Sequence, residues 1–215
     1  MVKIPFFKSG FLAEKKPAGE GGQAAAPDSA EEGISRQEIE LLKIVLLRYK
    51  EHIESSESKS IIEMKAMIKP HDPVIHAQRD SIAEEFHPYI YDQHFMQAAK
   101  LACGRAEAIK TVSLPLNFWL SYDDMVAIGA GDEIGKAMFL CSILRSLDSQ
   151  DAKVAICADG RPRVAFGFGK KTYVCAPGEG IGEKPIEGDM EAIDGQKVSY
   201  TFNDLEYADK SGGDG

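Results

Sequence analysis

Apolar side chains recur at three- and four-residue spacing through the segment 132–147. The stripe consists of Ile134, Ala137, Met138, Cys141, Leu144 and Leu147. Three further apolar residues widen it, namely Phe139, Leu140 and Ile143. This spacing predicts a helix, and the narrow polar face that remains predicts a helix buried on most sides. Asp132 is placed to cap its N-terminus, and Arg145 complements the helix dipole near its C-terminal end.

After this segment the apolar pattern changes to the spacing of strands. Three short apolar runs follow at 153–158, 163–168 and 172–176, and Asp159-Gly160 between the first two is a hairpin signal. A last edge strand is predicted by three alternating apolar residues, Val198, Tyr200 and Phe202. The pattern therefore predicts an α+β fold, in which a buried central helix packs on a small antiparallel sheet.

The composition of the chain changes along its length and divides it into four parts. Residues 1–33 are rich in Ala, Gly, Pro, Glu and Gln, which is typical of a disordered tail. A capping box at Ser35–Glu38 opens a helical hairpin or short coiled-coil-like arm over 34–69. We expect the α+β domain at 70–208 and a flexible acidic tail at 209–215.

The first arm helix carries an apolar seam of coiled-coil type. Its members are Ile39, Leu42, Leu46, Tyr49 and Ile53. The seam is barely two heptads long, and isolated helices of this length are marginal in water. It can pack on its own domain, or it can join two chains in a homodimer.

Charge and cysteine usage exclude several classes of function. The net charge of −9 argues against nucleic-acid or anionic-lipid binding, because phosphate recognition needs a basic surface. No apolar run is long enough to span a membrane, and we recognise no secretory signal. None of the four cysteines forms a Cys-x-x-Cys pair, which argues against a zinc site. All four lie inside apolar patterns, which predicts buried free thiols in a cytoplasmic protein: Cys103, Cys141, Cys157 and Cys175.

Several motifs together resemble the transglutaminase-like domain, a papain-like Cys-His-Asp fold. They are Gly131-Asp132, Lys136-Ala137, the run Leu-x-x-Ile-Leu-Arg-Ser-Leu at 140–147, and the hairpin segment 163–177 that ends in a proline. The resemblance covers about residues 70–177. It implies a central helix feeding a meander of strands, as the apolar pattern also predicts.

The resemblance also implies where catalytic residues would stand. In this family a nucleophilic Cys opens the central helix, a His comes from the second strand, and an Asp ends the third. These positions fall on Glu133, on or next to Arg163, and on Ala176, and all three have the wrong chemistry. Every histidine of the chain lies at or before His94, so none can come from the strands. The resemblance thus implies a degenerate member that lacks the triad and binds a protein or peptide.

The retained cleft of such a domain is expected to be lined by four residues, Trp119, Asp132, Glu133 and Arg163. We expect Glu133 and Arg163 to face each other there as an ion pair. The alternative function is a cysteine-dependent amide hydrolase or acyl-transferase that uses a displaced thiol, Cys141 or Cys103. A third is an assembly protein that dimerises through the seam of the first helix.

The histidines are the remaining candidates for chemistry. His71 and His76 lie close in sequence, as do His87 and His94, and each pair has an aspartate between its members. Neither pair has the i, i+4 spacing of a helical zinc motif. We therefore expect solvated or hydrogen-bonded histidines and neither a metal nor a cofactor, and these four would be the first residues to consider as ligands.

Overall fold

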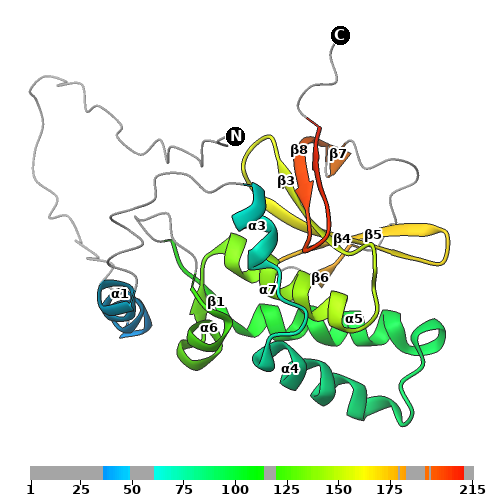
Figure 1. Ribbon diagram of the computed structural model, residues 1–215, viewed down its shortest axis with the longest axis horizontal. Helices are drawn as coiled ribbons and strands as arrows, with labels where there is room; N and C mark the ends of the chain where they lie inside the picture. The colour runs from blue at the N-terminus through cyan, green and yellow to red at the C-terminus, as the bar shows by residue number, and fades with distance from the viewer. Residues whose placement is uncertain are drawn as a thin grey trace, which may run out of the picture.

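The computed structural model describes residues 36–48, 61–113, 120–178, 180–182, 192–193 and 195–210 (Figure 1). Its helices are α1 (Arg36–Arg48), α3 (Ile61–Met67), α4 (Pro73–Ala83), the short 3-10 helix η1 (Glu84–Phe86), α5 (Tyr91–Ala108), α6 (Tyr122–Ile128) and α7 (Glu133–Ser146). Its strands are β1 (Lys110–Thr111), β2 (Ala130–Gly131), β3 (Lys153–Cys157), β4 (Pro162–Phe168), β5 (Lys171–Ala176), β6 (Gly180–Ile181), β7 (Ala192–Ile193), β8 (Gln196–Phe202) and β9 (Tyr207–Asp209). The mixed helical and antiparallel composition confirms the α+β class.

The predicted central helix is α7, and it lies between a sheet and a layer of helices (Figure 1). It contacts β3 and β4 on one side and α4 and α5 on the other. Leu140, Ile143 and Leu144 are completely buried. The N-cap is Asp132, whose Oδ1 accepts a hydrogen bond of 2.7 Å from the Gly135 amide, as a carboxylate at this position should. Burial of the helix on most sides is confirmed.

The main sheet has the strand order β6-β5-β4-β3-β8-β7, and β9 pairs with β8. The pairs β3–β4, β4–β5 and β3–β8 are antiparallel, which confirms the three-strand meander. The strand predicted at Val198–Phe202 is present as part of β8, but it is not an edge strand. It lies between β3 on one side and the preceding β7 and the following β9 on the other, because short hairpins at both of its ends add these two strands. The residues of the turn at 203–206 form no apolar pattern from which the sequence could predict this reversal.

Alternation along the strands gives the sheet two different faces. Val164 and Phe166 on β4 and Val154 on β3 belong to the main core beneath α7. Ala155 on β3 instead belongs to a second, smaller cluster on the opposite face, together with Cys157, Ile193 and Val198. Since successive strand residues point to opposite faces, this division also decides where the polar residues of β4 lie.

The two arm helices contribute to the same core. Leu41 of α1, Met64 of α3 and Ile68 are buried in the cluster that contains α7. Of the predicted seam, Ile39 is 43% exposed and Leu42 is half-buried, so Leu41 rather than the seam supplies the deepest contact. The side chain of Leu46, and Tyr49 and Ile53 altogether, lie outside the described residues, as do the predicted N-terminal tail and most of the C-terminal one.

A buried group of hydrogen bonds ties the chain after α3 to the core. The Tyr122 hydroxyl on α6 donates to the Met67 carbonyl at 2.7 Å and lies 2.7 Å from the Ser142 Oγ on α7. Ser142 Oγ also accepts a 3.0 Å bond from the Lys69 amide. Buried polar atoms need such partners, so these bonds fix the chain that leads from α3 toward α4.

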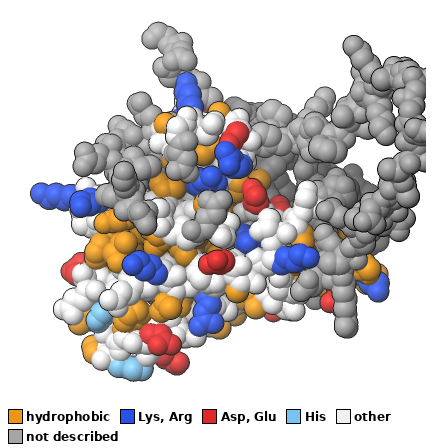
Figure 2. Space-filling view, turned by 180° about the vertical axis from the view of Figure 1, so that it is seen from behind, with side chains coloured by type: hydrophobic (Ala, Val, Ile, Leu, Met, Phe, Trp, Pro, Cys, Tyr) orange, Lys and Arg blue, Asp and Glu red, His pale blue; other side chains and the backbone are white. Residues whose placement is uncertain are grey.

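The surface of the described part is mixed in charge. Seen from behind, basic and acidic side chains are interspersed with apolar ones among the coloured residues (Figure 2). Within the ranges that the structure describes, no helix combines the length and the apolar character needed to cross a bilayer.

A buried ion pair joins the C-terminal end of α7 to the turn between β8 and β9. Arg145 Nε donates to Asp204 Oδ1 at 2.8 Å and its Nη2 donates to Oδ2 at 3.1 Å. Its Nη1 donates to the Gln150 carbonyl. The Arg145 side chain is only 5% exposed, so its charge depends on these partners.

We predict that Asp204→Ala lowers the free energy of unfolding by about 3 kcal/mol, because it leaves the buried Arg145 guanidinium without its counter-charge. Glu206→Ala is the matched control in the same turn, since Glu206 pairs with Lys153 at 3.1 Å while 57% exposed. Its removal should cost less than about 1 kcal/mol. Urea unfolding followed by circular dichroism measures both, and equal losses would contradict the prediction.

Candidate functional site

Charged side chains lie at both ends of α7, whereas Ser142 in its middle is held by the Tyr122 hydroxyl and the Lys69 amide. The N-terminal end carries the first of the positions that the resemblance assigns to a triad. Glu133 is the first residue of α7 and is exposed. On the sheet, Val164 of β4 pairs with Cys175 of β5, so one step further Arg163 lies beside Ala176. The antiparallel register therefore places two of the three positions next to each other.

The expected ion pair between Glu133 and Arg163 is not formed. Glu133 and Arg163, both described, are not partners of each other in an ion pair. Arg163 is buried, and its Nη1 donates to the Pro162 carbonyl at 3.0 Å. It pairs in register with Ala155, whose side chain lies on the sheet face away from α7. The physical reason is the alternation of the strand: with Val164 facing the helix, Arg163 faces away from it.

Lys136 is the polar residue of this end that sequence reasoning did not single out as a site. It lies one turn into α7 and is 2% exposed. Its Nζ donates to the Thr111 Oγ1 at 2.8 Å and lies under the turn at Gly178. Burial lowers the pKa of Lys136, partly offset by the nearby charges of Glu133 and Glu107. The sequence feature that could have identified Lys136 is the presence of a lysine within an otherwise apolar helical segment.

The N-cap of α7 is also electrostatically unusual. Burial raises the pKa of Asp132 to about 6, although the hydrogen bond from the Gly135 amide acts in the opposite direction. Asp132 lies at the start of the helix, and the cleft expected there stays a prediction. Trp119, the fourth residue expected there, lies outside the described residues.

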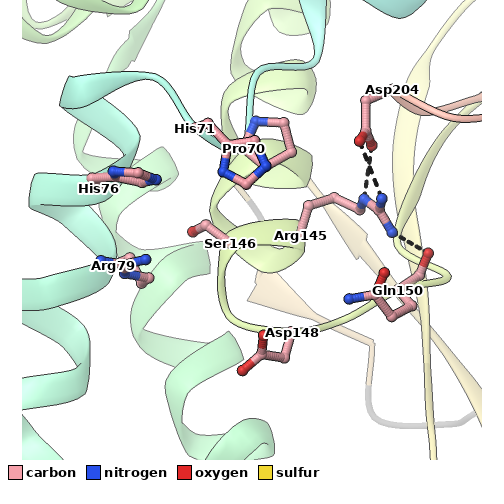
Figure 3. Close-up of a pocket in the computed structure, with 9 residues that line it drawn as sticks. All are labelled: Pro70, His71, His76, Arg79, Arg145, Ser146, Asp148, Gln150 and Asp204. Carbon is pink, nitrogen blue, oxygen red and sulfur yellow. Dashed lines mark hydrogen bonds and ion pairs between the residues drawn. The ribbon is translucent and has the colours of Figure 1, made fainter.

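At the opposite end of α7 the structure contains a pocket of about 210 Å³ (Figure 3). It is lined by Pro70, His71, His76, Arg79, Arg145, Ser146, Asp148, Gln150 and Asp204. The loop before α4 and the exposed side of α4 form one wall, and the end of α7 with its following turn forms the other. Nothing in the local sequence joins these two walls, because α4 and the end of α7 are about 70 residues apart in the chain.

His71 and His76, two of the candidate ligands, meet at this pocket. Their ring centroids are 5.8 Å apart, at an interplanar angle of 81°. Asp72 between them caps α4, accepting a 3.0 Å bond from the Val74 amide, and so holds the loop that carries His71. The pocket therefore presents two imidazoles whose position is set by a helix cap.

The other two histidines lie elsewhere. His94 Nδ1 accepts a 3.0 Å hydrogen bond from the Ile90 amide, and its ring stacks on Phe86 at 5.1 Å. It therefore closes the N-terminus of α5. His87 is exposed in the turn before that helix. Over the described residues, no group of three or more His, Cys, Asp and Glu side chains could hold a metal ion.

The charged side chains around the pocket differ in how fully they are paired. Arg145 is neutralised by Asp204 and acts as a rigid floor. Arg79 is 36% exposed and pairs with the neighbouring Asp80 at 2.6 Å, a contact with little stabilising effect in solvent. Ser146 donates its hydroxyl proton to the Ile143 carbonyl at 2.7 Å, so it is held as part of the helix end and not as a nucleophile. The wall that remains adaptable consists of Arg79 and the two histidines.

The thiols proposed as displaced nucleophiles are deep in the core. Cys141 is completely buried in α7, and burial raises the pKa of its thiol well above the ordinary range. Cys103 on α5 is 5% exposed and lies against Cys175 of β5. A reactive cysteine needs access and a stabilised thiolate, and the environment of Cys141 provides neither.

No protein-family model, no curated protein and no solved structure matches this chain. The transglutaminase-like resemblance therefore stays a prediction made from the residues. What the structure adds is the buried helix, the meander and the positions of the polar groups at the two ends of α7.

We predict that Asp132→Asn changes the pH dependence of stability. The folded protein keeps a proton on Asp132 up to about pH 6, whereas the unfolded chain releases it near the ordinary value of 3.8. Folding therefore loses stability as pH rises through this window, by about 2 kcal/mol. Asn retains an oxygen for the Gly135 amide but has no proton to lose. In urea unfolding from pH 4 to 7, the free energy of unfolding of the variant should rise relative to that of the wild type as pH rises. Parallel dependences of the two free energies on pH would refute this.

We also predict that Cys141 is protected from alkylation in the folded chain. Its labelling requires unfolding, so iodoacetamide at pH 8 should modify it at least about a thousandfold more slowly than a cysteine in a short peptide. Peptide mass spectrometry with and without urea gives both rates. Rapid labelling of Cys141 under native conditions would instead favour the thiol-dependent hydrolase.

Proposed function

We propose that this chain is a non-catalytic domain of transglutaminase-like type that acts as a protein- or peptide-binding scaffold module in the cytoplasm. Three features support the proposal. Glu133, Arg163 and Ala176 stand at the triad positions of the family. The thiol of Cys141 is completely buried, and burial raises its pKa despite the nearby charge of Arg145. The pocket at the end of α7 has a rigid floor and an adaptable polar wall.

The pocket is the recognition site in this proposal. Its volume of about 210 Å³ lies below the roughly 300–1,000 Å³ typical of small-molecule and cofactor sites. That size suits one side chain presented by a partner. A protein surface that takes up single side chains in a preformed pocket is characteristic of binding hot spots.

The chemistry of the wall favours an acidic side chain. His71, His76 and Arg79 all offer N–H donors to the same space, while Arg145 beneath them is already satisfied by Asp204. A guanidinium with a planar fork of donors is well matched to a carboxylate. Asp148 on the other wall can accept N–H groups from the backbone of the bound peptide. The single observation that carries this proposal is the convergence of two imidazoles and Arg79 on one pocket.

Because the chain carries a net negative charge, recognition of an acidic side chain must rely on short-range contacts and not on long-range attraction. At −9, the chain repels an acidic partner at long range. Affinity must then come from the short-range hydrogen bonds inside the pocket, and salt should not abolish it. This separates the proposed site from a general basic patch, whose binding salt weakens.

The test is binding of an immobilised library of 12-residue peptides that contain Asp or Glu, with Asn and Gln counterparts as paired probes. The full chain should bind a subset of the acidic peptides and discriminate against their amide counterparts. Arg79→Ala should weaken that binding about 10- to 100-fold, the loss expected for one charge-assisted contact.

Arg161→Ala is the matched control, because Arg161 is likewise an exposed arginine paired with a nearby aspartate, Asp159, at 2.6 Å. It lies on the β3–β4 hairpin and should leave peptide binding unchanged. Failure to bind any acidic peptide, or equal losses in the two variants, would overturn the assignment of the pocket.

A further inference from the structure

Two of the four cysteines touch each other across the core. Cys103 lies on α5 and Cys175 on β5, 72 residues apart in sequence, and their Sγ atoms are 2.7 Å apart. Both are buried, with exposures of 5% and 1%, and both are free thiols. A disulfide bond is about 2.05 Å long, so a shift of less than 1 Å would bring the sulfurs to bonding distance.

The described residues around the pair show how it is placed. Among them, no group of three or more His, Cys, Asp and Glu side chains could hold a metal ion. Cys175 belongs to the core face of β5, because it pairs in register with the buried Val164. Arg163 on the neighbouring strand influences the Cys175 thiol electrostatically, and no histidine does so.

We propose that Cys103 and Cys175 form an oxidative modification site, which closes to an intramolecular disulfide when the chain meets a hydroperoxide. This inference is independent of the proposed recognition pocket, which lies at the opposite end of α7. Its effect is to join α5 covalently to the strand that leads into the Gly178 turn above Lys136.

The reaction balances in two steps. The Cys103 thiol releases its proton, and its sulfur attacks one oxygen of hydrogen peroxide. The O–O bond breaks, and the leaving hydroxide takes up the released proton, so a sulfenic acid and one water are formed. The Cys175 sulfur then attacks the Cys103 sulfur, the S–O bond breaks, and the hydroxyl leaves as a second water with the remaining thiol proton. The two thiols together lose two electrons and two protons, and the peroxide is reduced.

The order of the two sulfurs follows from their environments. Cys103 is the more exposed and meets the oxidant first. Contact with Cys103 and burial both raise the pKa of the Cys175 thiol, which makes it a poor primary nucleophile. Its fixed position against Cys103 compensates for this in the second step, because the reacting atoms are already in contact.

The experiment treats the reduced full chain with hydrogen peroxide, blocks remaining thiols, and maps disulfides by digestion without reductant. We expect one cross-linked peptide pair joining Cys103 to Cys175, removed by dithiothreitol, on a chain that remains a monomer in denaturing gels. The oxidised chain should melt several degrees higher than the reduced one, since the link closes a long loop.

Cys103→Ala and Cys175→Ala should each abolish the cross-link and the gain in melting temperature, while Cys157→Ala should retain both. Circular dichroism of each reduced variant checks that it is folded. Should an unfolded variant arise, the wild-type peptide map alone decides. Oxidation of Cys103 to sulfinic acid without pairing, or disulfides that join other cysteines or separate chains, would overturn the proposal.

Discussion

The structure depends on the burial of α7, which is enclosed by the sheet on one side and by α4 and α5 on the other. A helix with apolar residues around nearly its whole circumference is stable only when neighbours cover each face. The sheet supplies the inward residues of β3 and β4, and Phe95 of α5 packs against Phe166 with a centroid distance of 5.6 Å. Within the described residues, α4, α5, β3 and β4 make the main contacts that complete this enclosure.

Enclosure leaves charged side chains at the two ends of α7, and the ends differ. The N-terminal end holds Asp132 as a cap and Lys136 as a buried cation bound to Thr111. The C-terminal end holds the Arg145–Asp204 pair, which supports a pocket open to solvent. At the N-terminal end, Asp132 and Lys136 already have hydrogen-bond partners within the chain. The second end offers donors that are still able to bind a partner, which is why we place recognition there.

The core also brings reactive groups together without exposing them. Cys103 and Cys175 meet because α5 packs against the end of the sheet formed by β5 and β6, and Cys141 is enclosed because α7 is covered. The same packing that buries Cys141 thus creates a two-thiol contact elsewhere. Burial by itself therefore does not decide whether a thiol is inert; the identity of its neighbour does.

Much of the fold was determined by the sequence alone, because helices and strands follow from local spacing. The stripe of α7 and its Asp132 cap, and the meander with its Asp159-Gly160 turn, were predicted and are present. Even the error over Arg163 was avoidable, since placing Val164 inward places Arg163 outward. The buried Lys136, the meeting of His71 and His76 at the end of α7, and the contact of Cys103 with Cys175 were decided only by the tertiary structure. Each depends on which segments, distant in the chain, pack together, and side-chain periodicity carries no information about that.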